Sequence, residues 1–187
     1  MAEVATEALE RVEICDYDPA WPAHFAVEQV LLAELLQRPA DAIEHVGSTA
    51  IPGLCAKPVI DIMARLASLD AAERYLPALR ERGFALIDTG MRDRLFLRRP
   101  AGDGRPMIHL HLVGEPAWDE RNERLLRDHL GNRPELAKEY GALKRALAQR
   151  FPHDSLAYTR AKTDFVQEVV DAARDARGLP RVPVWED

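Results

Sequence analysis

The sequence has 187 residues, which suits one domain, or one domain with a small helical addition. Its 47% hydrophobic and 30% charged residues indicate an ordinary globular protein, and the absence of an apolar run of about 18 residues argues against a membrane protein. The net charge is −6, and residues 1–45 alone carry ten acidic and two basic side chains, so a broad basic surface for extended nucleic acid is excluded.

We expect no export signal in the N-terminal segment. MAEVATEALERVEIC is acidic and lacks the basic-then-apolar order of a signal peptide. Cys15 and Cys55 are forty residues apart, and in a cytosolic chain this favours buried free thiols over a disulfide. The lack of a Cys-x-x-Cys pair argues against a structural zinc site. We therefore expect a cytoplasmic protein.

Short apolar runs alternate with helical patterns along the first two thirds of the chain. Asp18 and Pro19 have the residue types that begin a helix, and Gly83 has the type that ends one. The predicted elements are a strand at 12–15, a helix at 19–37, strands at 40–46 and 58–66, a helix at 69–82, and strands at 84–88, 94–99 and 106–113.

The pattern changes from residue 118 onward. Three helical stretches, 118–130, 134–150 and 155–177, follow one another, separated by Gly131 and Pro152. The sequence therefore predicts an α+β fold, with a mixed β-sheet, flanking helices and a helical C-terminal segment. We expect an α/β core over 1–117 and a helical segment over 118–187 that packs on it as one compact unit.

Strand alternation brings polar side chains to one face of the predicted sheet. Asp61 shares a face of its strand with Met63, and His109 shares one with His111. A carboxylate among apolar neighbours needs a partner, so we expect one for Asp61. His-x-His on a strand is the spacing of a hydrogen-bonded pair, but it is also a metal-ligand spacing. Asp61 on a neighbouring strand would make Asp61, His109 and His111 a candidate metal site.

Two helices each carry a lysine within an apolar stripe. Lys144 follows Tyr140 by four residues, and Lys162 follows Tyr158 by four. Such lysines often extend to water, but two on successive helices favour a cationic lining for an anionic ligand.

The loop after the second predicted strand combines small and hydroxyl residues. Gly47 allows close backbone approach, and Ser48 and Thr49 offer hydroxyl and amide groups to a phosphate. The P-loop pattern is absent, so a plain turn between strands remains the alternative.

The segment HVGSTAIPGLCAKPVIDI resembles the GrpB family, a branch of the nucleotidyltransferase (polymerase-β-like) superfamily. The segments VEICDYDPAWPAHFAVE, RLFLRRP, IHLHLV, YGALKRALAQRF and YTRAKTDFVQEV follow in the family's order, so the resemblance covers nearly the whole chain. It implies a nucleotidyltransferase-like mixed sheet, a Gly47-Ser48 loop that holds nucleotide phosphates, and Asp61 as a ligand of Mg²⁺.

Two positions depart from the superfamily pattern. Met63 stands where a second acid is expected, and His109 and His111 stand on the strand that would supply a third carboxylate. Imidazole suits Zn²⁺ or Mn²⁺ better than Mg²⁺. Either the metal therefore differs, or catalysis has been lost and a binding pocket is retained. Lys57 and Arg94 would partly replace the missing positive charge at a phosphate.

The resemblance therefore implies a nucleotidyltransferase-like protein that binds a nucleoside triphosphate or a related phosphorylated small molecule. It would transfer a nucleotidyl group to a small acceptor with a divalent metal (Mg, Mn or Zn). The alternatives are a catalytically inactive nucleotide- or anion-binding module on the same fold, and a metal-dependent phosphoester hydrolase. Family members also occur fused to dephospho-CoA kinase. The expected site residues are Asp61 for catalysis, Asp61, His109 and His111 for metal, and Gly47, Ser48, Thr49, Lys57, Arg94, Lys144 and Lys162 for phosphate.

Overall fold

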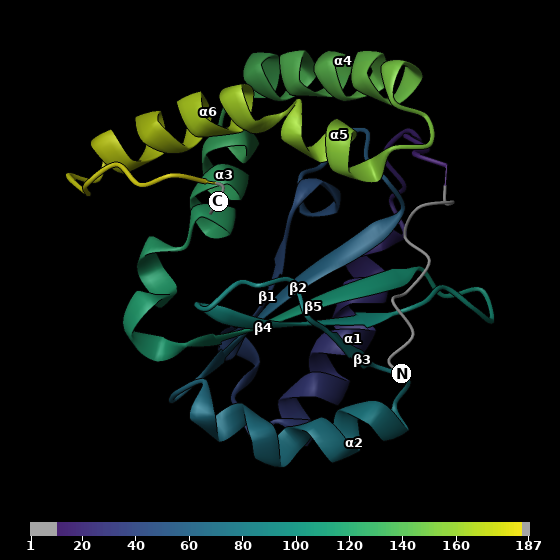
Figure 1. Cartoon of the computed structure of the whole chain (residues 1–187), viewed down its shortest axis with the longest axis vertical. Coiled ribbons are helices and arrows are strands. Elements are labelled where there is room, and N and C mark those ends of the chain that lie inside the picture. Colours follow the sequence, from purple (N-terminus) through teal and green to yellow (C-terminus); the bar gives the residue numbers. More distant parts are fainter. Residues whose placement is uncertain (1–10, 185–187) are drawn as a thin grey trace.

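A five-stranded mixed sheet lies at the centre of the computed structural model, which describes residues 11–184 (Figure 1). The strands are β1 (Ile43–Val46), β2 (Val59–Leu66), β3 (Ala85–Ile87), β4 (Arg94–Arg99) and β5 (Met107–Gly114). Their order across the sheet is β1-β2-β5-β4-β3, with β2 and β5 parallel and the other neighbours antiparallel. The ends of the two predicted divisions, 1–10 and 185–187, lie outside the described residues.

Helices flank this sheet, which confirms the predicted α+β fold. The α-helices are α1 (Trp21–Leu35), α2 (Leu76–Glu81), α3 (Asn122–Gly131), α4 (Pro134–Arg150), α5 (Ser155–Arg160) and α6 (Thr163–Asp175). Short 3₁₀ helices cover Ala40–Ala42, Ser48–Ala50, Asp70–Tyr75 and Glu115–Glu120. Figure 1 shows α4, α5 and α6 together at one end of the molecule and α2 at the opposite end. Within residues 11–184, no helix combines the length and apolar character needed to cross a bilayer.

The main hydrophobic core lies against one face of the sheet. Alternate residues of the central strands point into it and are fully buried: Ile60, Ile62, Ala64, Ile108, Leu110 and Leu112. Trp21 and Leu32 of α1 and Leu79 of α2 cover this face. Each large apolar side chain buried here stabilises the fold by about 1.5–3 kcal/mol. The core therefore fixes which residues of β2 and β5 face the other way.

A second apolar cluster joins the helical C-terminal part to the loop between β1 and β2. Ile51 and Leu54 of that loop pack against Leu130, Tyr140 and Val169 from α3, α4 and α6. Because the loop begins with the Gly47-Ser48 turn, this packing holds the helices directly over the turn. The loop between β1 and β2 is thus held by the two strands on one side and by the C-terminal helices on the other.

Several predicted helices are divided in the structure. The stretch 69–82 becomes a 3₁₀ helix followed by α2, because Pro77 disfavours a regular helix through the residues before it. The stretch 118–130 divides at Arg121, whose backbone is extended, and 155–177 divides at Lys162, the residue before α6. The division at Lys162 places its side chain at a helix junction.

The N-terminal predictions also shift. The segment 12–15 forms only an isolated bridge between Cys15 and Ala56, since the Val12 N–H donates instead to the Pro152 carbonyl. Helix α1 begins two residues later than predicted, and Asp18 accepts a hydrogen bond from the Ala20 N–H at 2.8 Å without capping the helix itself. Both cysteines are free thiols, as expected, but only Cys55 is buried as predicted, and Cys15 is exposed.

Candidate functional site

The face of the sheet opposite the main core carries a row of polar side chains. Asp61 of β2 is paired in register with His109 of β5, and His109 with Arg98 of β4. Paired residues of neighbouring strands project to the same face, so these three side chains form a line across the sheet. His109 Nδ1 lies 3.2 Å from Asp61 Oδ1, and the two side chains remain 26% and 29% exposed. His109 is therefore the partner that the sequence analysis expected for Asp61, and both side chains are exposed enough for a ligand to reach them.

Gly47 holds the loop against this carboxylate. Its φ is +72°, in the region that favours glycine, and a Cβ at this position would lie 2.3 Å from Asp61 Oδ2. Any side chain at position 47 would therefore displace Asp61. This close approach sets the distance between the Gly47-Ser48 turn and β2.

Three lysines lie near one another, and one of them, Lys144, contacts the turn; we call Lys57, Lys144 and Lys162 the lysine cluster. Lys144 Nζ lies 2.9 Å from Ser48 Oγ and also donates to the Cys55 carbonyl. Lys162 Nζ lies 4.4 Å from the centre of the Tyr158 ring, and Lys57 Nζ lies 4.9 Å from the same centre. The structure thus brings together three of the four predicted cationic site residues, from the loop, α4 and the start of α6.

Burial and mutual repulsion weaken the hold of these lysines on their protons. Burial lowers the pKa of Lys144 to about 7, and the charges of Lys162 and Arg145 act in the same direction. Burial likewise lowers the pKa of Lys162 to about 8, helped by the charge of Lys57. A cluster with lowered pKa values lacks enough negative charge around it, which an anionic ligand would supply.

Asp61 is the carboxylate that this cluster faces. Burial opposes its ionisation, but the hydrogen bond and charge of His109, with smaller contributions from His111 and His45, outweigh burial and lower its pKa. Asp61 is therefore ionised at neutral pH. One carboxylate opposite three lysines leaves the surroundings of Ser48 positively charged when the lysines are protonated.

The predicted metal ligands are only partly brought together. Asp61 Oδ1 and His109 Nδ1 are 3.2 Å apart, a separation that two neighbouring ligands can have when each lies about 2.1 Å from one ion. His111 lies two residues further along β5, where its ring packs on Phe96 and its buried Nδ1 has no hydrogen-bond partner. Across residues 11–184, no three His, Cys, Asp or Glu side chains are grouped to hold a metal ion. The residues present fit a divalent ion with two protein ligands, Asp61 and His109.

Thr49 and Met63 are buried, and their side chains contact other parts of the protein interior. Thr49 is buried, donates to the Val59 carbonyl at 2.9 Å, and contacts His45 Nε2 at 2.9 Å. Its hydroxyl therefore links β1 to β2 beneath the turn instead of facing the lysine cluster. Met63 is fully buried with Val46 in a small apolar cluster, so the position of the expected second acid is part of the protein interior.

Arg94 lies apart from the lysine cluster. Its guanidinium pairs with Asp93 at 2.9 Å and with Glu123 of α3, and Asp93 also pairs with Arg121 at 2.6 Å. These two carboxylates balance its charge. The structure therefore does not bring Arg94 to the anionic end of the site, where the sequence analysis placed it.

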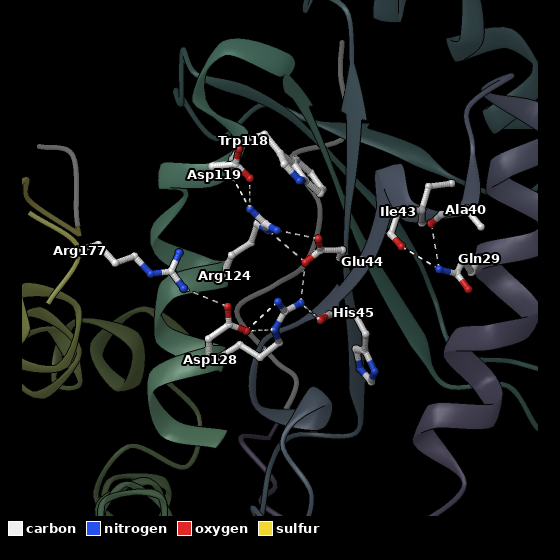
Figure 2. Close-up of polar contacts among 11 residues, drawn as sticks. Gln29, Ala40, Ile43, Glu44, His45, Trp118, Asp119, Arg124, Asp128 and Arg177 are labelled. Atoms are coloured by element: carbon white, nitrogen blue, oxygen red, sulfur yellow. Dashed lines mark hydrogen bonds and ion pairs between the residues drawn. The ribbon is translucent and has the colours of Figure 1, made fainter. Parts of the chain in front are cut away.

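A second set of ion pairs ties α3 to β1 next to the turn (Figure 2). Glu44 accepts hydrogen bonds from Arg124 at 2.9 Å and from Arg127 at 2.7 Å, and Arg127 also donates to the His45 carbonyl at 2.9 Å. Arg127 pairs in addition with Asp128. Because Glu44 lies three residues before Gly47, this network fixes the strand that leads into the turn.

Sequence reasoning assigned no role in the site to Tyr140 or Tyr158. Lys144 lies 4.6 Å from the Tyr140 ring, and Tyr140 stacks on Phe165 with ring centres 5.0 Å apart. The repeated Tyr-x-x-x-Lys spacing, at Tyr140 and at Tyr158, was the available signal, since residues four apart are neighbours on a helix. Strand alternation predicts that Arg98 shares a face of its strand with Arg94, and the pairing of β4 with β5 puts Arg98 next to His109.

Comparison with known proteins agrees with this architecture. The family described as GrpB protein matches residues 11–172. A UPF0157 protein of Pseudomonas aeruginosa is 37% identical over 92% of this chain and 72% of its own length. The crystal structure of the conserved protein GrpB from Enterococcus faecalis superposes with a TM-score of 0.77 at 26% identity, covering 89% of this chain and 99% of that one. A dephospho-CoA kinase of Mycolicibacterium paratuberculosis is 28% identical over 88% of this chain but only 46% of its own length. This chain belongs to the GrpB family.

Proposed function

We propose that the protein binds a nucleoside triphosphate or a related phosphorylated small molecule, with its phosphates against the lysine cluster and Ser48. The observation that carries this proposal is the grouping of Lys57, Lys144 and Lys162, with Lys144 in contact with Ser48. The chain has 21 arginines and only four lysines, so three quarters of its lysines gather at this place. Compact ammonium groups bind phosphate as point charges, whereas Arg94, Arg124 and Arg127 pair with carboxylates of the protein.

The small acceptor of the proposed reaction would bind at the row of Asp61, His109 and Arg98 on the sheet. Asp61 would orient His109 through their hydrogen bond, and the ionised carboxylate would help position a hydroxyl or amine of a small acceptor. When a divalent ion is bound, Asp61 and His109 would hold it in place of their hydrogen bond, and the ion would supply positive charge to the phosphates. The similarity to a dephospho-CoA kinase supports a phosphorylated, nucleotide-like ligand.

A second candidate is an anion-binding module on the same fold that does not transfer a nucleotidyl group. Its specific support is Met63, which is fully buried where the superfamily has its second acid. With one carboxylate in place of two, binding can persist while metal-assisted transfer is lost. Turnover of a bound nucleotide separates the two candidates.

Isothermal titration calorimetry tests the binding step. We expect a nucleoside triphosphate to bind the wild-type chain, and Lys162→Gln to weaken binding about tenfold or more, since a hydrogen bond to a charged group contributes about 1.5–3 kcal/mol. Lys138→Gln is the matched control, because Lys138 is the remaining lysine and is exposed on α4. Equal weakening by both substitutions, or no binding by any nucleotide, pyrophosphate or phosphate, would refute the proposal.

The same titrations give a second measurement. An anion beside the lysine cluster raises the pKa of Lys162 from about 8, so binding near pH 8 should take up protons from solution. Repeating the titration in buffers of different ionisation enthalpy measures this uptake. Titrations with and without Mg²⁺, Mn²⁺ or Zn²⁺, on the wild type and on Asp61→Ala, test the divalent ion separately. Proton release on binding would contradict the placement of the phosphates.

A further inference from the structure

Ser48 and Lys144 form a hydroxyl–amine pair with the geometry of a catalytic dyad. Lys144 Nζ lies 2.9 Å from Ser48 Oγ, within hydrogen-bond distance. Lys144 is only 2% exposed, while Ser48 is half-buried at the Gly47 turn. A base shielded from water beside a hydroxyl that a ligand can reach is the arrangement that activates a serine.

The remaining contacts of Lys144 leave its lone pair for Ser48. A neutral amine carries two N–H groups and one lone pair, and one N–H group donates to the Cys55 carbonyl. The lone pair can then accept the Ser48 hydroxyl proton. Burial lowers the pKa of Lys144 to about 7, so a large share of this amine is neutral at physiological pH. Arginine cannot lose its proton in this way, which gives a reason for lysine here in a chain that otherwise uses arginine.

The surroundings of the pair suit an anionic electrophile. Lys162 and Lys57 lie on the Tyr158 ring, and Asp61 is the carboxylate that contributes to the pKa of both Lys144 and Lys162. The Tyr140 hydroxyl hydrogen-bonds Ser48, and burial raises the pKa of Tyr140, so it stays protonated and acts as a donor. Ammonium groups facing the serine would stabilise the charge that develops on a phosphoryl group under attack.

We propose that Ser48 is a nucleophile and Lys144 its general base, and that the pair attacks a phosphoanhydride of the bound ligand to give a covalent seryl phosphoester. This inference rests on the proposed function for the class of substrate. The bond from Ser48 Oγ to phosphorus forms as the anhydride P–O bond breaks. The leaving phosphate takes the bonding electron pair, and the hydroxyl proton passes to Lys144 Nζ. Transfer of the group from Ser48 to a small acceptor would complete a two-step reaction.

A small uncharged alkyl fluorophosphonate tests the nucleophile without requiring anion binding. Its phosphorus bonds to Ser48 Oγ, fluoride leaves, and the proton again passes to Lys144. Intact-protein mass spectrometry should show one adduct, and peptide mapping should place it on Ser48. Ser48→Ala should remove the adduct. Ser68→Ala should leave it unchanged, because Ser68 is an exposed serine before the 3₁₀ helix Asp70–Tyr75.

The role of Lys144 has its own variants. Lys144→Met and Lys144→Arg should each slow labelling about 100-fold, as expected when a general base is lost, whereas Lys138→Gln should label at the wild-type rate. Arginine keeps the charge but accepts no proton, so the two variants separate the base from a mere cation. Circular dichroism and thermal melts establish that each variant is folded. If either variant is not folded, the pH dependence of the labelling rate of the wild type tests whether Lys144 is the general base.

For the wild type, labelling should rise with pH through about 7 as Lys144 loses its proton. The charged and titratable groups that influence Lys144, from all the elements around it, are Cys55, Asp61, Arg145 and Lys162, with Tyr140 on the adjacent turn of α4. Labelling that does not change between pH 6 and 8 would overturn the role of Lys144.

The possible failures are distinguishable. Absence of the adduct on Ser48, or wild-type labelling of a folded Lys144→Met, overturns the dyad while calorimetric binding still upholds the proposed function. An adduct on Ser48 without binding of any phosphorylated ligand overturns the proposed function and the phosphoanhydride substrate, but upholds the nucleophile. Incubation with a nucleoside triphosphate should also give a phosphoryl or nucleotidyl adduct on Ser48, and its absence despite binding overturns the covalent step.

Discussion

Gly47→Ala perturbs the turn and the carboxylate together. The added methyl group would lie 2.3 Å from Asp61 Oδ2 and 3.0 Å from Asp61 Cβ, so the Asp61 side chain must turn away from His109. The backbone at position 47 has φ of +72° and ψ of −172°, a combination that is essentially restricted to glycine. A single methyl group therefore strains the loop and breaks the central hydrogen bond of the site.

The magnitude follows from these two effects. The backbone conformation costs a residue with a Cβ about 1–3 kcal/mol. The hydrogen bond between His109 and the ionised Asp61 contributes about 1.5–3 kcal/mol, and both side chains are less than one third exposed. Together these effects predict that Gly47→Ala lowers the free energy of unfolding by roughly 2.5–6 kcal/mol.

Urea denaturation followed by circular dichroism measures this loss. Gly53→Ala is the matched control, because Gly53 has φ of +79° in the same loop and a Cβ there would meet nothing within 4 Å. Gly53→Ala should show the backbone cost alone, about 1–3 kcal/mol. The reasoning is refuted if Gly47→Ala is no more destabilising than Gly53→Ala, or if ligand binding at Asp61 is unchanged in it.

Three further predictions concern buried groups. Met63→Asp should destabilise the fold by several kcal/mol and create no metal binding, because the position is apolar. The control Met63→Leu should cost less than about 1.5 kcal/mol. A stable Met63→Asp variant that binds Mg²⁺ would contradict the apolar environment described for this position. Arg99→Met should lower the free energy of unfolding by about 3–5 kcal/mol, because Glu28 is left buried without its partner at 2.5 Å; a loss below 1 kcal/mol in urea denaturation would exclude this role. The guanidinium groups around Glu44 outweigh its burial and lower its pKa, so its contribution to stability is present above pH 4.5 and is lost as pH falls through the folded-state pKa. Glu44→Gln should therefore flatten the loss of stability below pH 4.5, and an unchanged acid profile would count against it.

The local elements could be predicted because their signals are local. The apolar alternation of β2 and β5 is in the sequence itself, and it places Asp61 and His109 opposite the core face. The strand predicted at 94–99 coincides with β4, and the helix predicted at 134–150 coincides with α4. Breaks within helices were missed, since the extended Arg121 and the junction at Lys162 depend on how the C-terminal part packs.

Within the site, the sequence by itself determined which residues are polar among apolar neighbours, and so selected Asp61, Lys144 and Lys162. Tertiary structure decided which of them meet. Strand order β1-β2-β5-β4-β3 puts Asp61 next to His109, while α3 draws Arg94 into an ion pair with Glu123 and away from the lysine cluster. Contacts between residues 29 to 96 positions apart arise only when the core and the loop cluster fix the elements in space. For that reason no local pattern reveals that Lys144 lies against Ser48.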